Sequence, residues 1–366
     1  MEILFKGLLQ STWQDWLMIA VGLLLIYLAV KKDFEPSLLV PMGFGCIMAN
    51  IPLTGAIGQG GVLTIFKDAL IVTEIAPLLI FIGIGAMIDF GPLLQNPLML
   101  LFGAAAQFGI FATLIVAALL GYPLNEAASI GIIGAADGPT SIFVASRFAK
   151  ELLGPISVAA YSYMSLVPMI QPPVIKALTT KRERMIRMPY KPEKISKAVK
   201  LLFPIVVTLI SGIIAPQSIA LIGFLMFGNF LRECGVVDRL SKSAQNEMVN
   251  ITTILLGLAI GSTMVGSQFV QVSTLGIILL GLVAFVFDTA GGVIFAKILN
   301  IFLKNKINPM VGAAGISAFP MSARVVQKIA QKEDPGNFIL MHSIGSNVAG
   351  QVGSVIAGGI LIALLS

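Results

Sequence analysis

Long apolar runs recur along the whole chain, and they constrain its fold more than any other feature of the sequence. Ten runs are expected to cross a membrane, near residues 14–30, 36–52, 72–90, 94–121, 155–175, 198–215, 217–232, 249–266, 273–297 and 337–364. A helix needs ~20 apolar residues to span a bilayer, whereas a β-strand needs only ~10. Charged residues make up 11% of the chain, against roughly 25% in a soluble domain. The sequence therefore predicts an all-α polytopic membrane protein and excludes a soluble enzyme and a nucleic-acid binder.

The net charge of +6 comes from one short stretch of the chain. Residues 176–200 contain nine of the 24 Lys and Arg residues but only two of the 18 acidic residues, which leaves 15 basic and 16 acidic residues elsewhere. Basic loops stay on the cytoplasmic side during membrane insertion. We therefore predict that this loop is cytoplasmic. It either sets the topology alone or also docks a soluble partner or lipid headgroups.

Two more apolar segments, about 125–150 and 309–331, are interrupted by Pro, small residues and polar groups. If each segment enters and leaves the membrane on one side, the remaining basic clusters also fall in the cytoplasm. If both segments cross instead, Lys31-Lys32 and Lys328/Lys332 move outside, against the positive-inside rule. We therefore predict two re-entrant broken hairpins.

The two halves of the chain also match each other. The matching pairs are Gly43-Phe44 with Gly223-Phe224, Gly85 with Gly261, Gly134-Ala135-Ala136 with Gly312-Ala313-Ala314, and Arg147 with Arg324, at offsets of 176 to 180 residues. This register predicts two membrane repeats, 14–175 and 198–366, on either side of the basic cytoplasmic loop at 176–197. Each repeat has five spans, an odd number, so the two are inverted. Inverted repeats with broken helices are typical of secondary transporters.

The tip of the first hairpin carries a carboxylate in an apolar stretch, in the run Gly134-Ala-Ala-Asp137-Gly-Pro-Thr-Ser. A charge at this depth is costly unless it faces a cavity and has a partner. Carboxylate, hydroxyl and carbonyl oxygens suit Na⁺ or H⁺ rather than a soft metal. We expect Asp137 to be an ion ligand; the alternative is that it only caps the helix that follows.

Neutral oxygen donors lie at the second tip and in the spans that follow the two hairpins. They are Asn308, Ser317, Asn347 and Tyr163. Asn347 could equally form a hydrogen bond between helices, and Tyr163 could be an ordinary packed aromatic residue. The sequence alone leaves these alternatives open.

Two further charged residues have two interpretations each. Asp288, in the middle of the span at 273–297, is either a second cation ligand or proton acceptor, or a group that neutralises a buried base or binds a free amide. Arg324 ends the second hairpin, where its guanidinium could bind a carboxylate in bidentate fashion or extend to the interface.

At these residues the chain resembles the β subunits of the sodium-pumping biotin-dependent decarboxylases, which serve oxaloacetate, methylmalonyl-CoA, glutaconyl-CoA and malonate. The matching stretches are Gly134-Ala-Ala-Asp137-Gly-Pro-Thr-Ser with the following Ile-Phe-Val-Ala-Ser-Arg147, Asn308-Pro-Met-Val-Gly312-Ala-Ala-Gly-Ile-Ser317-Ala-Phe-Pro320, Tyr161-Ser-Tyr163-Met-Ser-Leu-Val-Pro-Met-Ile-Gln-Pro-Pro173, and Asn347-Val-Ala-Gly350. The resemblance extends from about residue 14 to the end of the chain.

The resemblance implies a carboxybiotin decarboxylase that couples decarboxylation to Na⁺ export and consumes a proton. The catalytic residues that we predict with it are Asp137, Tyr163 and Arg324, with Arg324 binding carboxybiotin. The predicted Na⁺ ligands are Asp137, Asn308, Gly312, Ser317 and Asn347, the last of which joins the set by its spacing.

The chain lacks a carrier-type Met-Lys-Met motif, so biotin must arrive on another protein. The implied partners are a carboxyltransferase subunit, a biotin carrier protein and a small membrane-anchoring subunit. We also expect a homo-oligomer in the inner (plasma) membrane. The alternative function is a secondary Na⁺/H⁺ antiporter or a Na⁺-coupled organic-anion transporter without chemistry, because inverted repeats and midplane acids fit both classes.

Overall fold

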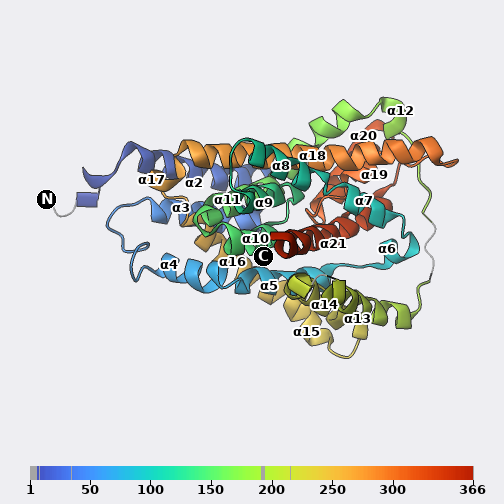
Figure 1. The fold of residues 1–366 in the computed structure, drawn as a ribbon, viewed down its shortest axis with the longest axis horizontal. Coiled ribbons are helices and arrows are strands. Elements are labelled where there is room, and N and C mark those ends of the chain that lie inside the picture. The colour runs from blue at the N-terminus through green and yellow to red at the C-terminus, as the bar shows by residue number, and fades with distance from the viewer. Residues whose placement is uncertain (1–5, 8, 34, 191–193, 215, 366) are drawn as a thin grey trace.

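Helices form all of the regular secondary structure in residues 6–7, 9–33, 35–190, 194–214 and 216–365, which are the residues that the computed structural model describes. This agrees with the all-α class predicted from the apolar runs. Figure 1 shows the long helix α18 (Val272–Phe302) along one edge of the molecule and α13 (Lys197–Ile214), α14 (Ile219–Cys234) and α15 (Asp238–Ser243) along the opposite edge. Between them lies α21 (Leu340–Leu365).

The other helices follow in chain order. The first half contains α2 (Trp13–Lys32), α3 (Pro36–Ala49), α4 (Val62–Phe66), η1 (Lys67–Val72), α5 (Ile75–Met87), α6 (Gly91–Gln95), α7 (Met99–Ala105), α8 (Phe108–Leu119), α9 (Leu124–Gly131), η2 (Ile132–Ala135), α10 (Gly138–Phe148), η3 (Lys150–Leu152) and α11 (Leu153–Leu178). The basic loop contains α12 (Lys181–Arg184). The second half adds η4 (Pro216–Ser218), η5 (Ala244–Met248), α16 (Val249–Gly261), α17 (Gly266–Phe269), α19 (Met310–Ala313) and α20 (Met321–Glu333).

Several of these helices are long and apolar enough to cross a membrane. In the described residues they are α2, Met99–Leu119, Lys150–Leu178, α18 and α21, with the bent pair Val62–Val72 and Ile75–Met87 as a sixth candidate. The pair bends by 61° at Glu74, whose φ of +64° is left-handed. The chain is therefore a multi-pass membrane protein. All ten apolar runs contain a helix, but that all ten cross the membrane stays a prediction.

Both interrupted segments contain a break between helices, whereas their re-entrant course stays a prediction. In the first, η2 ends at Ala136, whose φ is +51°, and α10 begins at Gly138. Pro139 follows in the first turn of α10, where a missing N–H costs nothing. In the second, α19 has only four residues, and α20 begins after Pro320. Each break exposes backbone and side-chain polar groups inside an otherwise apolar protein, which is where the candidate site lies.

Candidate functional site

Asp137 lies at the first break, between η2 and α10. Its side chain is 3% exposed, and Oδ1 accepts a hydrogen bond from the backbone N–H of Thr140 at 3.2 Å. This bond makes Asp137 the N-cap of α10. The capping interpretation therefore describes one of its two carboxylate oxygens.

The second oxygen, Oδ2, accepts three side-chain hydrogen bonds. The donors are Thr140 Oγ1 at 2.8 Å, Gln351 Nε2 at 3.0 Å and Ser354 Oγ at 2.7 Å. Capping requires none of them, because Oδ1 already satisfies the backbone N–H. Among the described residues, no basic side chain forms an ion pair with Asp137. A buried carboxylate with oxygen-bearing neighbours and no base is suited to a small hard cation.

Ser317 brings the second break to the same place. Its backbone N–H donates to the carbonyl of Ala135 at 3.0 Å, two residues before Asp137. Its hydroxyl donates to the carbonyl of Gly350 at 2.9 Å, next to Gln351. The tips of both broken segments therefore meet on α21.

Asn347 lies one turn before Gln351 on α21 and also contacts the second tip. Its Nδ2 donates to the carbonyl of Ile316 at 2.6 Å, and its buried Oδ1 has no hydrogen-bond partner within the described ranges. The structure thus places Asp137, Ser317 and Asn347 where the two tips meet α21. An unpartnered amide oxygen at this point is available to a cation.

Tyr163 contacts a different helix. Its hydroxyl donates to the carbonyl of Ile278 on α18, and no hydrogen bond joins it to Asp137. Tyr161 lies against the first break instead, since a Cβ added to Gly138 would stand 2.4 Å from its ring. The buried Tyr161 hydroxyl has no hydrogen-bond partner among the residues that the structure describes.

Gly312 and Asn308 make packing and loop contacts rather than contacts with Asp137. A Cβ on Gly312 would stand 2.0 Å from the carbonyl oxygen of Gly292, so its glycine permits α19 to approach α18. The Nδ2 of Asn308 donates to the carbonyls of Arg184 and Ile186, both at 2.9 Å. Its Oδ1 accepts the N–H of Met310 at 3.1 Å.

Arg324 lies on the exposed face of α20 and forms no ion pair in the described part of the chain. A cavity of about 210 Å³ lies along the same helix, and its lining is basic and proline-rich. The lining residues are Pro168, Pro172, Lys176, Val325, Lys328, Ile329, Lys332 and Glu333. Arg324 itself does not line this cavity.

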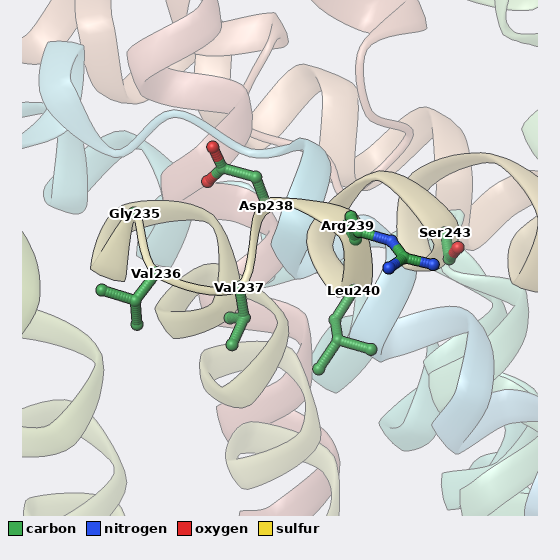
Figure 2. A pocket seen from close by; sticks show the side chains of 7 residues that line it. All are labelled: Gly235, Val236, Val237, Asp238, Arg239, Leu240 and Ser243. Atoms are coloured by element: carbon green, nitrogen blue, oxygen red, sulfur yellow. The ribbon is translucent and has the colours of Figure 1, made fainter.

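A larger surface hollow lies far from these residues in the sequence, in the connection between α14 and α15. Figure 2 shows its seven lining residues, with Asp238 and Arg239 among small and aliphatic side chains. Its volume is about 640 Å³. None of the predicted site residues lines it, so size alone does not locate the site.

Ion pairs outside the spans attach the basic loop to the end of α20. Arg184 Nε lies 2.8 Å from Glu333 Oε1, and Arg187 donates to both oxygens of Asp334 at 2.7 and 3.0 Å. The hydrogen bond from the Arg187 guanidinium lowers the pKa of Asp334 below its ordinary value. The Asp334 carboxylate therefore stays ionised beside the loop.

Sequence reasoning missed Gln351 and Ser354 as partners of Asp137. Together with Asn347 they recur at spacings of four and three residues, which places all three on one face of α21. A search of the last span for polar residues at helical spacing would have found this signal.

Residues 14–365 match the sequence model of a family described as the Na⁺-transporting oxaloacetate decarboxylase beta subunit. The chain belongs to this family. It is 51% identical to the glutaconyl-CoA decarboxylase subunit beta of Acidaminococcus fermentans over 360 residues, covering 98% of this chain and 96% of the relative. It is 51% identical to the methylmalonyl-CoA decarboxylase subunit beta of Veillonella parvula over 361 residues (99% and 96%). It is 46% identical to the oxaloacetate decarboxylase beta chain of Klebsiella pneumoniae over 417 residues (97% and 96%).

These matches confirm the resemblance drawn from the motifs. They favour the β subunit of a sodium-pumping decarboxylase over a secondary transporter without chemistry. Membership of the family also makes the chain one subunit of a multi-subunit, biotin-dependent decarboxylase.

Proposed function

We propose that this chain decarboxylates carboxybiotin presented by a separate carrier protein, and that Na⁺ passes through the site at Asp137. The observation that carries the proposal is the crowding of Asp137 Oδ2 by three side-chain donors, two of them from α21. Capping of α10 does not require these three donors. Hydroxyl groups can turn their lone pairs toward a cation, so the same side chains can surround Na⁺.

Asp137, Ser317 and Asn347 are the proposed direct Na⁺ ligands. They come from the first tip, the second tip and α21, so a movement of either tip changes the set of oxygens around the ion. Asn308 and Gly312 stay predicted members of the Na⁺ site. Their contacts with the basic loop and with α18 favour an indirect effect on Na⁺ binding, through the position of the second broken segment.

The packing of the two halves supports the proposed inverted repeats. In the predicted repeats, α3 is equivalent to α14, and α5 is equivalent to α16. Helix α3 packs on α16, and the equivalent helix α14 packs on α5. Gly85 and Gly261 hold equivalent places in these pairs. A Cβ on Gly85 would stand 1.8 Å from Leu225 O, and a Cβ on Gly261 would stand 2.1 Å from Met42 O. The same glycine-mediated approach therefore occurs twice.

The contacts at the ends of the second broken segment support a re-entrant hairpin. Asn308 begins this segment and Asn337 follows it. Asn337 Nδ2 donates to the carbonyls of Arg184 and Ile186, both at 3.2 Å, and these are the carbonyls that Asn308 also binds. A segment whose two ends bind the same pair of carbonyls returns to the side from which it started.

The end of the first broken segment fits the opposite, outer side. Ser146 Oγ donates to Glu74 Oε1 at 2.7 Å, and Arg147 Nε lies 3.5 Å from the same oxygen. Arg147 also donates to Gln217 at 3.4 Å. Glu74 and Gln217 are both outside in the predicted topology, with the basic loop inside. We therefore propose an inner-membrane protein with residues 176–200 in the cytoplasm.

Arg324 is the proposed carboxybiotin-binding residue. In decarboxylation the bond between the ring nitrogen of biotin and the carboxylate carbon breaks. The carboxylate leaves as CO₂, and the nitrogen keeps the electron pair of the broken bond and takes up a proton. An exposed guanidinium on the cytoplasmic hairpin can hold the carboxylate before this step. Asp137 and Tyr163 are the proposed proton-handling residues.

The relatives support a division of labour among subunits. Their names contain three different substrates, glutaconyl-CoA, methylmalonyl-CoA and oxaloacetate. This chain is nevertheless 46–51% identical to all three relatives over nearly its whole length. We propose that a carboxyltransferase subunit selects the acid and that a biotin carrier protein links it to this chain. A small membrane-anchoring subunit and further copies of the chain complete the proposed assembly.

The substitution Asp137→Asn tests the proposed function. In proteoliposomes that contain the whole complex, we expect Asp137→Asn to abolish both Na⁺-dependent decarboxylation and Na⁺ transport, because the ion loses its charged ligand. Asp238→Asn, at an exposed carboxylate, is the matched control and should retain both. Full Na⁺ uptake by the Asp137→Asn complex would contradict the assignment. Na⁺ flux from the chain alone, without biotin, would favour the transporter alternative.

A further inference from the structure

Asp288 is a second buried carboxylate, and the proposed function gives it no role. It lies near the middle of α18 and is 0% exposed. In the described part of the chain it forms no ion pair with a Lys, Arg or His. The interpretation that it neutralises a buried base therefore has no partner to support it.

Among the described residues, only one of its two oxygens has a hydrogen-bond partner. Oδ1 accepts the backbone N–H of Ile110, in the first turn of α8, at 3.2 Å. Oδ2 is buried and receives no hydrogen bond from the part of the chain that the structure describes. A carboxylate that keeps its charge under these conditions is strongly destabilised, and buried acids avoid this cost by pairing with a cation or by taking up a proton.

Asp288 Oδ2 lies beside Gly134, which belongs to the first broken segment. A Cβ added to Gly134 would stand 2.9 Å from Asp288 Oδ2 and 2.7 Å from the Cβ of Ala284. Gly134 belongs to η2, three residues before Asp137. Asp288 therefore contacts the segment that carries Asp137 without sharing the hydrogen bonds of Asp137.

The helices around Asp288 offer almost no competing charge. Of the elements that pack on α18, the sequences of α7, α8, η2 and α19 contain no titratable residue. The titratable residues of α9 and α11 are Glu126, Tyr161, Tyr163 and Lys176. Lys297, nine residues further along α18, donates a hydrogen bond to Leu178 O and forms an ion pair with Glu183.

We propose that Asp288 is a proton-binding site of the membrane core, separate from the Na⁺ site at Asp137. A proton on Oδ2 makes the carboxyl group neutral, and it needs no shell of further ligands, whereas Na⁺ needs several oxygens. Asp288 Oδ1 keeps its bond to α8 in either protonation state. If the proposed function is right, Asp288 is a further holding site for the proton that Asp137 and Tyr163 handle during decarboxylation. The proton site itself does not depend on that function.

Infrared spectroscopy of the purified complex tests the site without requiring turnover. We expect a carbonyl stretching band of a buried protonated carboxyl group that disappears in Asp288→Asn and persists in the control Asp238→Asn. The asparagine oxygen can still accept the Ile110 N–H, so the helix contact is preserved. If Asp288→Asn does not fold, Asp288→Glu should shift the band instead of removing it.

Two outcomes would overturn the proposal. A carboxyl band that is identical in wild type, Asp288→Asn and Asp288→Glu would show that no proton resides there. A loss of one bound ²²Na⁺ per chain in Asp288→Asn would assign the site to Na⁺ instead. Under the proposal, Asp288→Asn binds Na⁺ as wild type does and loses turnover by about 100-fold, the scale of a missing proton donor. A decarboxylation assay of the wild type checks the proposed function separately.

Discussion

Asp137 and Asp288 are both buried acids beside the same broken segment, but their surroundings differ. Asp137 receives four hydrogen bonds and Asp288 receives one. The hydroxyl and amide side chains around Asp137 can turn oxygens toward a cation, whereas the described hydrogen bond of Asp288 comes from a backbone N–H, which cannot. The donors therefore fit an ion ligand at Asp137 and a neutral acid at Asp288.

The hydrogen bond from Ser354 predicts a specific loss of Na⁺ affinity. Ser354→Ala removes the hydroxyl that donates a hydrogen bond to Asp137 Oδ2. A hydrogen bond to a charged group contributes about 1.5–3 kcal/mol. We expect the half-saturating Na⁺ concentration for decarboxylation to rise by about tenfold or more, since ~1.4 kcal/mol is a factor of ten.

Ser343→Ala is the matched control for this prediction. Ser343 lies on the same helix and is also fully buried, and its hydroxyl has no hydrogen-bond partner in the described part of the chain. Its substitution should leave the half-saturating Na⁺ concentration unchanged. Equal effects of the two substitutions would show that Ser354 acts through the packing of α21 and not through Asp137.

The basic loop is attached to the second hairpin by a clamp, which we define as Asn308, Asn337 and the carbonyls of Arg184 and Ile186. Both asparagines are fully buried. The ion pairs of Arg184 with Glu333 and of Arg187 with Asp334 lie beside it. A movement of this hairpin would therefore be transmitted to the loop that faces the proposed soluble partners.

Substitution of the two clamp asparagines tests whether Asn308 acts on Na⁺ directly. Asn337→Ala removes two hydrogen bonds to the loop carbonyls, and Asn308→Ala removes the same two together with the bond from the Met310 N–H; each contributes about 0.5–1.5 kcal/mol. We expect both variants to accelerate trypsin cleavage within the basic loop by about fivefold or more. We also expect them to change the Na⁺ dependence of decarboxylation to a similar extent.

Asn246→Ala is the control, because its Nδ2 bonds only Lys242 O, one turn earlier in the chain. It should change neither measurement. If Asn308→Ala alone raises the half-saturating Na⁺ concentration while Asn337→Ala does not, Asn308 is a direct ligand as the sequence predicted.

At the scale of the molecule, the helices and their breaks could be predicted from the sequence because the signals are local. Apolar runs give the spans, and Gly138-Pro139 and Pro320 give the breaks. The partners of Asn308 could not be predicted, since Arg184 and Ile186 lie more than 120 residues away and contribute backbone carbonyls that carry no sequence signal. The helical spacing of Gln351 and Ser354 is visible in the sequence, but only the fold shows that this face of α21 lies against Asp137.

Chemical labelling from each side of the membrane tests the orientation of the two repeats. Asn125 precedes the first hairpin and Lys304 precedes the second, at nearly equivalent positions, and both are exposed. Inverted repeats place them on opposite sides, with Lys304 in the cytoplasm. In right-side-out vesicles, we expect a membrane-impermeant maleimide to label Asn125→Cys and to spare Lys304→Cys until the vesicles are opened. The native Cys46 and Cys234 are buried, so their background should be low. Labelling of both introduced cysteines from one side would rule out inversion, while leaving the Asp137 site itself untouched.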